Sequence, residues 1–217
     1  MKKAIALFSG GKDTILSIEK ARRNGVEIVA AFHINFNSSS DGVVNDVHPD
    51  VVRAIANAIG ISDVEFRSVD PADMVREATN LAWAEGLTAL RARHPDADVL
   101  IVSADGSQIA NMQLFYTRLA QSVGMSIYVP YLSDYGTGFV ADLVEQNLEI
   151  RMYNYSKSQP KPPYDINGVV PIQDIIDALS VDALNIYSTM QTIVTNGNCF
   201  SAPVLTAVDS AGRIQLQ

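Results

Sequence analysis

Cysteine is almost absent from this chain of 217 residues, since Cys199 is the only one. One cysteine cannot close a disulfide within the chain or supply the thiolates of a zinc cluster. The three histidines are scattered and have no carboxylates at ligand spacing, so the sequence predicts no metal site built on them. Low cysteine content is typical of a reducing compartment, and we expect a cytoplasmic protein.

Basic residues are also scarce, with 16 Lys and Arg against 24 Asp and Glu and a net charge of -8. Nonspecific affinity for nucleic acid comes mostly from Lys and Arg on phosphates, so this balance disfavours a nucleic-acid partner, a tRNA substrate included. No apolar run approaches the roughly 20 residues of a membrane helix. The apolar run after Met1 is too short for a signal peptide, and we expect no membrane association.

The most informative segment present is the hexapeptide Ser9-Gly10-Gly11-Lys12-Asp13-Thr14. It follows the apolar run 4–8 and precedes a helical pattern, so the order is strand, glycine loop, helix. Two adjacent glycines allow a positive φ and let several N–H groups converge, while the helix start adds the positive end of its dipole. The segment therefore predicts an anion site that suits a phosphate chain, although an ordinary Gly-Gly turn remains an alternative.

Two common phosphate loops are excluded by the spacing of this segment. A Walker A loop needs Gly four residues before the Gly-Lys pair and Ser or Thr after the Lys, and this chain has Ala6 and Asp13 there. The dinucleotide fingerprint needs a third glycine soon after Gly11, and the next glycine is Gly25. Neither a P-loop nor a dinucleotide loop is predicted.

The hexapeptide resembles the PP-loop of the ATP pyrophosphatase superfamily, whose signature is S-G-G-x-D-[ST] after the first strand. The resemblance implies ATP and Mg²⁺ as cofactors, and cleavage of ATP between its α- and β-phosphates. Lys12 and Asp13 are implied as catalytic residues and Asp13 as the metal ligand. The loop is implied to wrap the β- and γ-phosphates through Ser9, Gly10, Gly11, Asp13 and Thr14, with Lys12 as a point charge beside them.

Apolar segments alternate with helical patterns in the βαβ manner that favours a parallel sheet. Strands are predicted at residues 4–8, 27–34, 64–69, 98–103, 126–129 and 148–153, and helices at about 15–24, 49–59, 70–82 resuming at 87–93, 108–123 and 136–147. The predicted fold is α/β, a Rossmann-like three-layer sandwich with a mainly parallel sheet of five to six strands. The resemblance implies the adenine nucleotide alpha hydrolase-like version of this fold.

The chain is expected to divide into a nucleotide-binding domain, 1–155, and a small α+β extension, 156–217. The extension begins with a proline-rich connector, followed by two amphipathic helices at 171–179 and 181–194. It ends in a predicted hairpin that spans 203–216. We expect the extension to pack on the first domain.

A looser resemblance to diphthine-ammonia ligases runs from residue 98 to about 158. It rests on the Asp105-Gly106-Ser107 turn, on Arg118 in the following helix, and on two segments, Val129-Pro130-Tyr131-Leu132 and Gly138-Phe139-Val140-Ala141. The chain departs from that branch at 165–171, where the ligases carry a segment rich in Gly and Glu. Sulfur-transfer members of the superfamily use a cysteine pair or an iron-sulfur cluster, which Cys199 alone does not match, so we expect it to be a buried small hydrophobe.

Ligands of parallel α/β sheets bind outside the carboxyl ends of the strands, so further contacts are predicted there. We assign His33 and Ile34 to the adenine wall, mainly through backbone groups, and Asp105, Gly106 and Ser107 to the ribose or α-phosphate side. Arg118 completes the predicted nucleotide site. Each has a simpler alternative: a satisfied rim histidine for His33, a plain turn at 105–106, and a surface ion pair for Arg118.

The predicted function is that of an ATP-dependent adenylating ligase of the diphthine-ammonia ligase-like type. A carbonyl oxygen of a small-molecule or peptide-borne substrate would attack the α-phosphorus of ATP, and ammonia or an amine would then displace AMP. The alternative is a noncatalytic ATP- or AMP-binding module of the same fold. The expected assembly is a homodimer.

Overall fold

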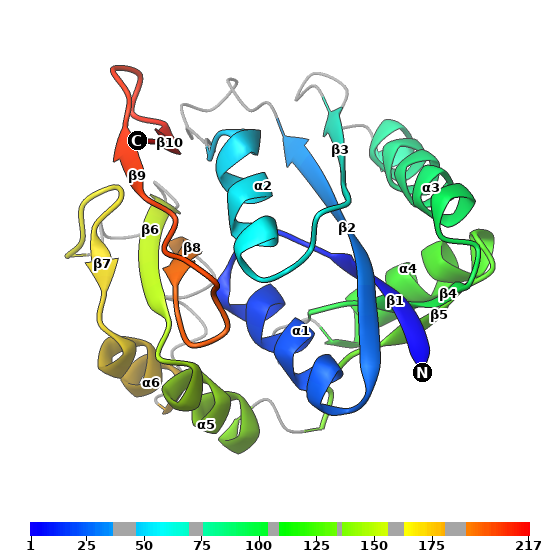
Figure 1. The fold of residues 1–217 in the computed structure, drawn as a ribbon, viewed down its shortest axis with the longest axis horizontal. Coiled ribbons are helices and arrows are strands. Elements are labelled where there is room, and N and C mark those ends of the chain that lie inside the picture. Colours follow the sequence, from blue (N-terminus) through cyan, green and yellow to red (C-terminus); the bar gives the residue numbers. More distant parts are fainter. Residues whose placement is uncertain (37–46, 70–75, 104–108, 134–135, 156–162, 181–189) are drawn as a thin grey trace.

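Short runs of Val, Ile, Ala and Phe form the central sheet of the protein. The computed structural model describes residues 1–36, 47–69, 76–103, 109–133, 136–155, 163–180 and 190–217. Five parallel strands make the main sheet in the order β3-β2-β1-β4-β5 (Figure 1). Their bounds are β1 Lys2–Leu7, β2 Val26–Phe36, β3 Val64–Val69, β4 Ala97–Ile101 and β5 Ser126–Tyr128.

Helices cover both faces of this sheet, because the central strand is apolar on both sides. On β1, Ala4 and Ala6 pack with α1 and α2, whereas Ile5 and Leu7 pack with the layer of α3 and α4. The result is a three-layer α/β sandwich, as the alternation of strand and helix patterns predicted. The helix bounds are α1 Lys12–Arg23, α2 Pro49–Ala58, α3 Arg76–Arg93 and α4 Ile109–Ser122.

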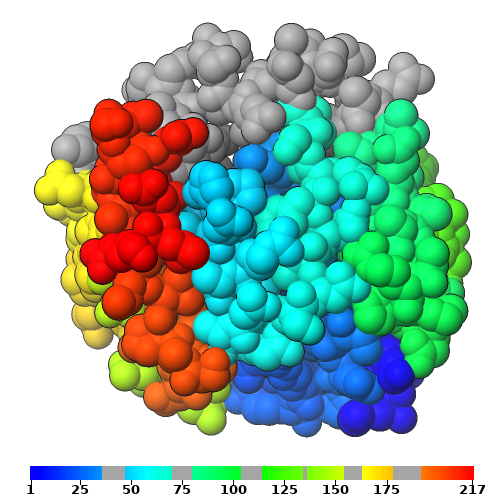
Figure 2. All heavy atoms as spheres, turned by 45° about the horizontal axis from the view of Figure 1, so that its top comes forward, coloured from blue at the N-terminus to red at the C-terminus, as the bar shows by residue number. Residues whose placement is uncertain are grey.

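The remaining elements form a smaller α+β part beside α1 and α2 (Figure 1). Its antiparallel sheet has the order β7-β6-β8, and β9 pairs with β10 as a hairpin. The N–H of His48, next to α2, donates to the carbonyl of Ile214 at 2.9 Å. Figure 2 shows the C-terminal residues lying against α2. The bounds are α5 Thr137–Gln146, β6 Glu149–Tyr155, β7 Val169–Val170, α6 Ile172–Ser180, β8 Met190–Asn196, β9 Thr206–Val208 and β10 Ile214–Leu216.

The extension shows both the successes and the errors of the sequence reading. The helix at 171–179 and the terminal hairpin are confirmed as α6 and the β9–β10 pair. The helix predicted at 181–194 is wrong from residue 190 onward, where β8 begins; residues 181–189 lie outside the described part. The run Thr192-Ile193-Val194 is β-branched and suits a strand, and pairing with β6 decides between the two patterns.

The segment 148–153 is a strand, but β6 does not join the main sheet. It pairs with β7 and β8, which lie after the expected boundary at residue 155. One apolar cluster also contains Ile15 and Ile18 of α1 together with Ile150 and Ile193 of the small sheet. The division into 1–155 and 156–217 therefore stays a prediction, and both the small sheet and the shared core include residues from the two sides of this boundary.

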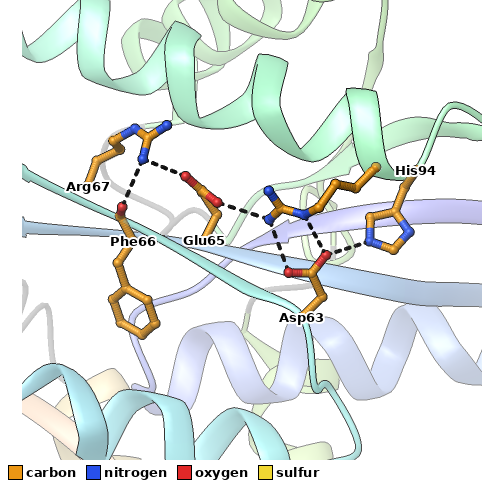
Figure 3. A network of polar contacts seen from close by, with 6 residues as sticks. Asp63, Glu65, Phe66, Arg67 and His94 are labelled. Carbon is orange, nitrogen blue, oxygen red and sulfur yellow. Dashed lines mark hydrogen bonds and ion pairs between the residues drawn. The ribbon is translucent and has the colours of Figure 1, made fainter.

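A network of ion pairs ties the end of α3 to the start of β3. The guanidinium of Arg93 contacts Asp63 at 3.0 Å and Glu65 at 2.9 Å, and His94 Nε2 lies 2.7 Å from Asp63. Figure 3 shows Glu65 also facing Arg67, at 2.6 Å. Hydrogen bonding from Arg93 holds the pKa of Asp63 below its usual value. This network lies at the amino end of β3, away from the carboxyl ends where the site is expected.

Within the described residues, no helix combines the length and the apolar character that crossing a bilayer requires.

Candidate nucleotide-binding site

The glycine loop, residues 9–14, lies at the point where the strand order changes direction: from β1 the chain adds strands first on one side of the sheet and then on the other. Its position follows β1, which is hydrogen-bonded to β2 on one side and β4 on the other. The chain leaves β1 through α1 toward β2 and returns later to β4, so the carboxyl end of β1 is the topological switch point. Ligands of open α/β sheets bind at such points.

The two glycines of the loop are required for different reasons. Gly10 has φ +76°, a conformation that side chains disfavour, and a Cβ there would lie 3.3 Å from Cδ1 of Ile55. Gly11 has an ordinary φ of -80°, but its Cβ would lie 2.9 Å from the carbonyl oxygen of Thr192. Gly10 therefore supplies backbone freedom, and Gly11 lets β8 approach the loop.

Hydroxyl groups brace the loop against the start of α1. The Thr14 hydroxyl donates to the carbonyl of Gly11 at 2.9 Å, and the Gly11 N–H donates to Ser9 Oγ at 3.2 Å. The two hydroxyl oxygens lie 3.4 Å apart. Ser9 and Thr14 thus hold the loop around the helix N-terminus, where N–H groups and the dipole favour an anion.

Lys12 and Asp13 form an ion pair at the first turn of α1. Lys12 Nζ lies 2.7 Å from Asp13 Oδ2, and the exposed fractions of the two side chains are 10% and 31%. The ammonium is therefore held close to the loop rather than extended into solvent. The carboxylate is accessible enough to accept a cation as well.

The oxygen donors of the loop suit a magnesium ion that is shared with phosphates. Mg²⁺ is commonly held by one or two carboxylates together with substrate phosphates and water. Asp13 offers the carboxylate, and the Ser9 and Thr14 hydroxyls stand in the same loop. In the described part of the chain, no group of three or more His, Cys, Asp and Glu side chains gathers that could hold a metal ion. A magnesium ion held by Asp13 would complete its coordination with phosphate oxygens and water.

His33 is fixed by the backbone next to the glycine loop. Its Nδ1 lies 2.7 Å from the carbonyl oxygen of Phe8, so Nδ1 carries the proton and donates. Burial lowers the pKa of His33 below its usual value, and its ring meets Phe66 edge-on at 5.5 Å between centroids. The lowered pKa favours the neutral ring, whose bond to Phe8 fixes it next to the loop.

The other predicted contacts have different outcomes. The side chain of Ile34 is 8% exposed and packs in the core on the α3–α4 side, so the backbone role assigned to it stays a prediction. Arg118 is exposed on α4, in a groove of about 750 Å³ lined also by Asn80, Leu114 and Phe115. This groove belongs to the helical layer opposite α1. Asp105, Gly106 and Ser107 lie outside the described residues.

Three residues that contact the loop were missed by the sequence reading. The N–H of Val194 donates to the carbonyl of Gly10 at 2.9 Å, the Thr192 carbonyl faces Gly11, and Ile55 lies against Gly10. Val194 and Thr192 come from β8, almost the whole length of the chain away from the loop. One sequence carries no signal for such a contact, because it depends on which surfaces meet after folding.

Comparison with protein-family models gives no match for this chain. Comparison with curated proteins gives none either.

Solved structures that are similar to this chain include the following two. One is described as a predicted subunit of tRNA methyltransferase from Methanocaldococcus jannaschii, with a TM-score of 0.49 and 16% identity over 91% of this chain and 98% of that one. The other is the U34-tRNA thiolase NcsA from Methanococcus maripaludis with its 4Fe-4S cluster, with a TM-score of 0.38 and 14% identity over 84% of this chain. This chain spans 65% of the thiolase.

Proposed function

We propose that this protein binds ATP with magnesium at the glycine loop and splits it into AMP and pyrophosphate. In the proposed reaction, a carbonyl oxygen of the substrate forms a bond to the α-phosphorus, and the bond from that phosphorus to the bridging oxygen of the β-phosphate breaks. Ammonia or an amine then attacks the activated carbon, and AMP leaves. The overall reaction is the formation of a carbon–nitrogen bond.

The observation that carries this proposal is the geometry of the loop at the switch point. Gly10 and Gly11 bring the chain close to the start of α1, and the nearly buried ammonium of Lys12 lies beside them. This combination provides fixed positive charge for a diphosphate that departs with additional negative charge. The likeness of residues 9–14 to the PP-loop signature supports cleavage at the α-phosphorus rather than at the γ-phosphorus.

The residues of the chain act by positioning and by charge. The helix N-terminus and Lys12 would hold the β- and γ-phosphates, and Asp13 would hold the magnesium ion that these phosphates share. Bound magnesium supplies further positive charge to the leaving diphosphate. Most of the rate would come from holding the acceptor oxygen in line with the α-phosphorus, since no protein nucleophile is required.

The acceptor is proposed to be a small-molecule or peptide-borne carbonyl compound, with a homodimer as the assembly. Two neighbours are named for tRNA, but the net charge of -8 favours an acceptor without a phosphate backbone. The thiolase carries an iron-sulfur cluster, whereas Cys199 is the only cysteine here, and burial raises the pKa of its thiol to about 11. Sulfur transfer through cysteine is therefore not part of the proposal.

Product analysis tests the proposal directly. The purified protein is incubated with magnesium and ATP, with ammonia, and with and without candidate carbonyl acceptors. Formation of AMP and pyrophosphate that depends on the acceptor supports the ligase. Formation of ADP and phosphate contradicts it, and ATP binding without turnover in any mixture supports the noncatalytic module instead.

A further inference from the structure

Strand β8 is the edge of the small sheet that meets the glycine loop. On its inner side it pairs with β6, and on its outer side the N–H of Val194 donates to the carbonyl of Gly10 at 2.9 Å. The carbonyl of Thr192 faces the Cα of Gly11, where even a methyl group would approach it to 2.9 Å. Two successive loop residues are thus in contact with one strand of the extension.

The bond from Val194 fixes the orientation of one peptide plane. A trans peptide is planar, with its C=O and N–H pointing in opposite directions. Because the Gly10 carbonyl points at β8, the N–H of Gly11 in the same plane must point away from β8. It does so in the structure, where it donates to Ser9 Oγ of the same loop at 3.2 Å.

Glycines on both sides make this plane the one that needs such a restraint. A peptide plane between two glycines turns over at little steric cost, since neither neighbour carries a Cβ. After such a turn, the Gly10 carbonyl would point away from β8, in the direction that the Gly11 N–H now takes, and a carbonyl oxygen repels phosphate. The loop would then present a negative group to its anion in place of a donor.

We propose that Val194 of β8 is a positioning residue of the nucleotide site, whose backbone N–H keeps the Gly10–Gly11 peptide turned so that its N–H faces the phosphates. This inference rests on the proposed function and adds the extension to the site. The small sheet then helps to position the backbone that binds the phosphates of the nucleotide. Its docking and ATP binding stabilise each other, because linked equilibria are reciprocal.

An amide-to-ester substitution at Val194 tests the inference without changing a side chain. Incorporation of the α-hydroxy acid that corresponds to valine replaces the N–H by an oxygen. The matched control is the same change at Met152 of β6, whose N–H donates to the carbonyl of Gly168 at 3.1 Å within the small sheet. Both side chains are fully buried, so the two esters differ mainly in whether the lost bond reaches the loop.

The readouts are the melting temperature and the Kd for ATP with magnesium, measured by calorimetry on the full chain. We expect both esters to lower the melting temperature to a similar degree. The Val194 ester alone should weaken ATP binding about five- to tenfold, the equivalent of one net hydrogen bond. Equal Kd values for the wild type and the Val194 ester, or equal losses in both esters, overturn the inference. A wild-type chain that binds no ATP overturns the proposed function, and this inference with it.

Discussion

Lys12 is a nearly buried lysine whose ammonium faces a carboxylate one residue away. A buried ammonium is costly unless it is paired, so its place beside the loop is maintained by Asp13 and by the fold around it. The proposed phosphate-binding role requires such a preorganised charge, whereas a simple turn does not. Lys3 and Asp96 form a similar ammonium–carboxylate pair at 2.6 Å, but this pair lies on the surface and away from the glycine loop.

Replacing Lys12 with methionine should lower the rate of AMP formation by about 10²-fold or more, because one preorganised positive group is lost from the departing diphosphate. The matched change Lys3→Met removes the other pair and should leave the rate within about twofold. Both rates are measured by following pyrophosphate release at saturating ATP. A Lys12→Met enzyme as active as Lys3→Met would contradict the role given to Lys12.

His33 should make the protein less stable in mild acid. Burial lowers the pKa of the folded His33, so below the unfolded value of about 6.5 the unfolded chain binds a proton that the folded chain does not. Stability therefore falls as the pH drops from 6.5 toward the lower folded pKa. Urea midpoints at pH 7.5, 6.5 and 5.5 measure this slope.

The control for this pH effect is His33→Asn, which keeps a side-chain N–H for the carbonyl of Phe8 and does not titrate. The difference between wild type and variant isolates His33 from other groups. We expect the variant to lose less stability than the wild type between pH 6.5 and 5.5. If the stability of wild type and variant falls equally with pH, folding does not lower the pKa of His33 and the prediction is wrong.

At the scale of elements, helix α3 packs very closely on strand β2, and its sequence pattern gives no sign of this contact. The pattern was interpreted as a helix to residue 82 that resumes at 87, and the structure has one continuous helix, Arg76–Arg93. Gly86 lies in the interruption because a Cβ there would come within 2.2 Å of the Phe32 ring. Trp83 meets the same ring edge-on, at 5.3 Å between centroids. Gly86 therefore lets α3 pack closely on β2.

Gly86→Ala should lower the free energy of unfolding by about 1–3 kcal/mol, since overpacking forces Phe32 or the helix to shift. Without that contact, alanine would favour the helix over glycine. The control is Gly136→Ala, where a Cβ meets open space and φ is -67°, so its effect should stay within about 1 kcal/mol. Chemical denaturation of both variants gives the comparison, and a Gly86→Ala protein as stable as wild type would rule out the tight contact.

The elements that sequence reasoning recovered are those defined by neighbouring residues. The glycine loop was readable because strand, glycines, lysine and helix start are contiguous, and the terminal hairpin because Asp209 and Gly212 mark its turn. Asp209 Oδ1 accepts from the N–H groups of Ala211 and Arg213, as a turn aspartate does. β8 was misread because its β-branched run fits either pattern, and only its pairing with β6 distinguishes them.

For the same reason, the candidate site was predicted only in part. Ser9 to Thr14 come together as a local motif, whereas the supports from Ile55, Thr192 and Val194 depend on packing between distant segments. Arg118 was assigned from a loose likeness of its helix, and its exposed place on α4 was not visible in the pattern. Burial and partner strands are properties of the whole fold.

For the whole molecule, the main sheet and the extension share one core. The cluster with Ile15 and Ile193 crosses the expected boundary, and Arg23 of α1 pairs with Asp142 of α5 at 2.5 Å. Asp142 also accepts from the hydroxyl of Tyr131. The shared cluster joins the main sheet to the extension, and the ion pair joins α1 to α5, so we expect these parts to unfold together.

Thermal unfolding should therefore show one transition. Trp83, the single tryptophan, reports on the α3 layer, whereas far-ultraviolet circular dichroism reports on all helices and strands. We expect the two signals to give the same midpoint, the usual sign of a two-state transition. A separate transition seen only by circular dichroism would indicate an extension that melts on its own.

The bond between Gly10 and Val194 also bears on the order in which the protein folds. Bringing together two residues that lie nearly the whole chain apart costs conformational entropy. Only the contacts of the surrounding core offset this cost, so the bond forms after that core. The neighbours of β1 in the sheet come much earlier in the chain, the later of them ending at residue 101. We therefore expect the main sheet to form before the proposed nucleotide site is complete, so that a compact species unable to bind ATP precedes the native state.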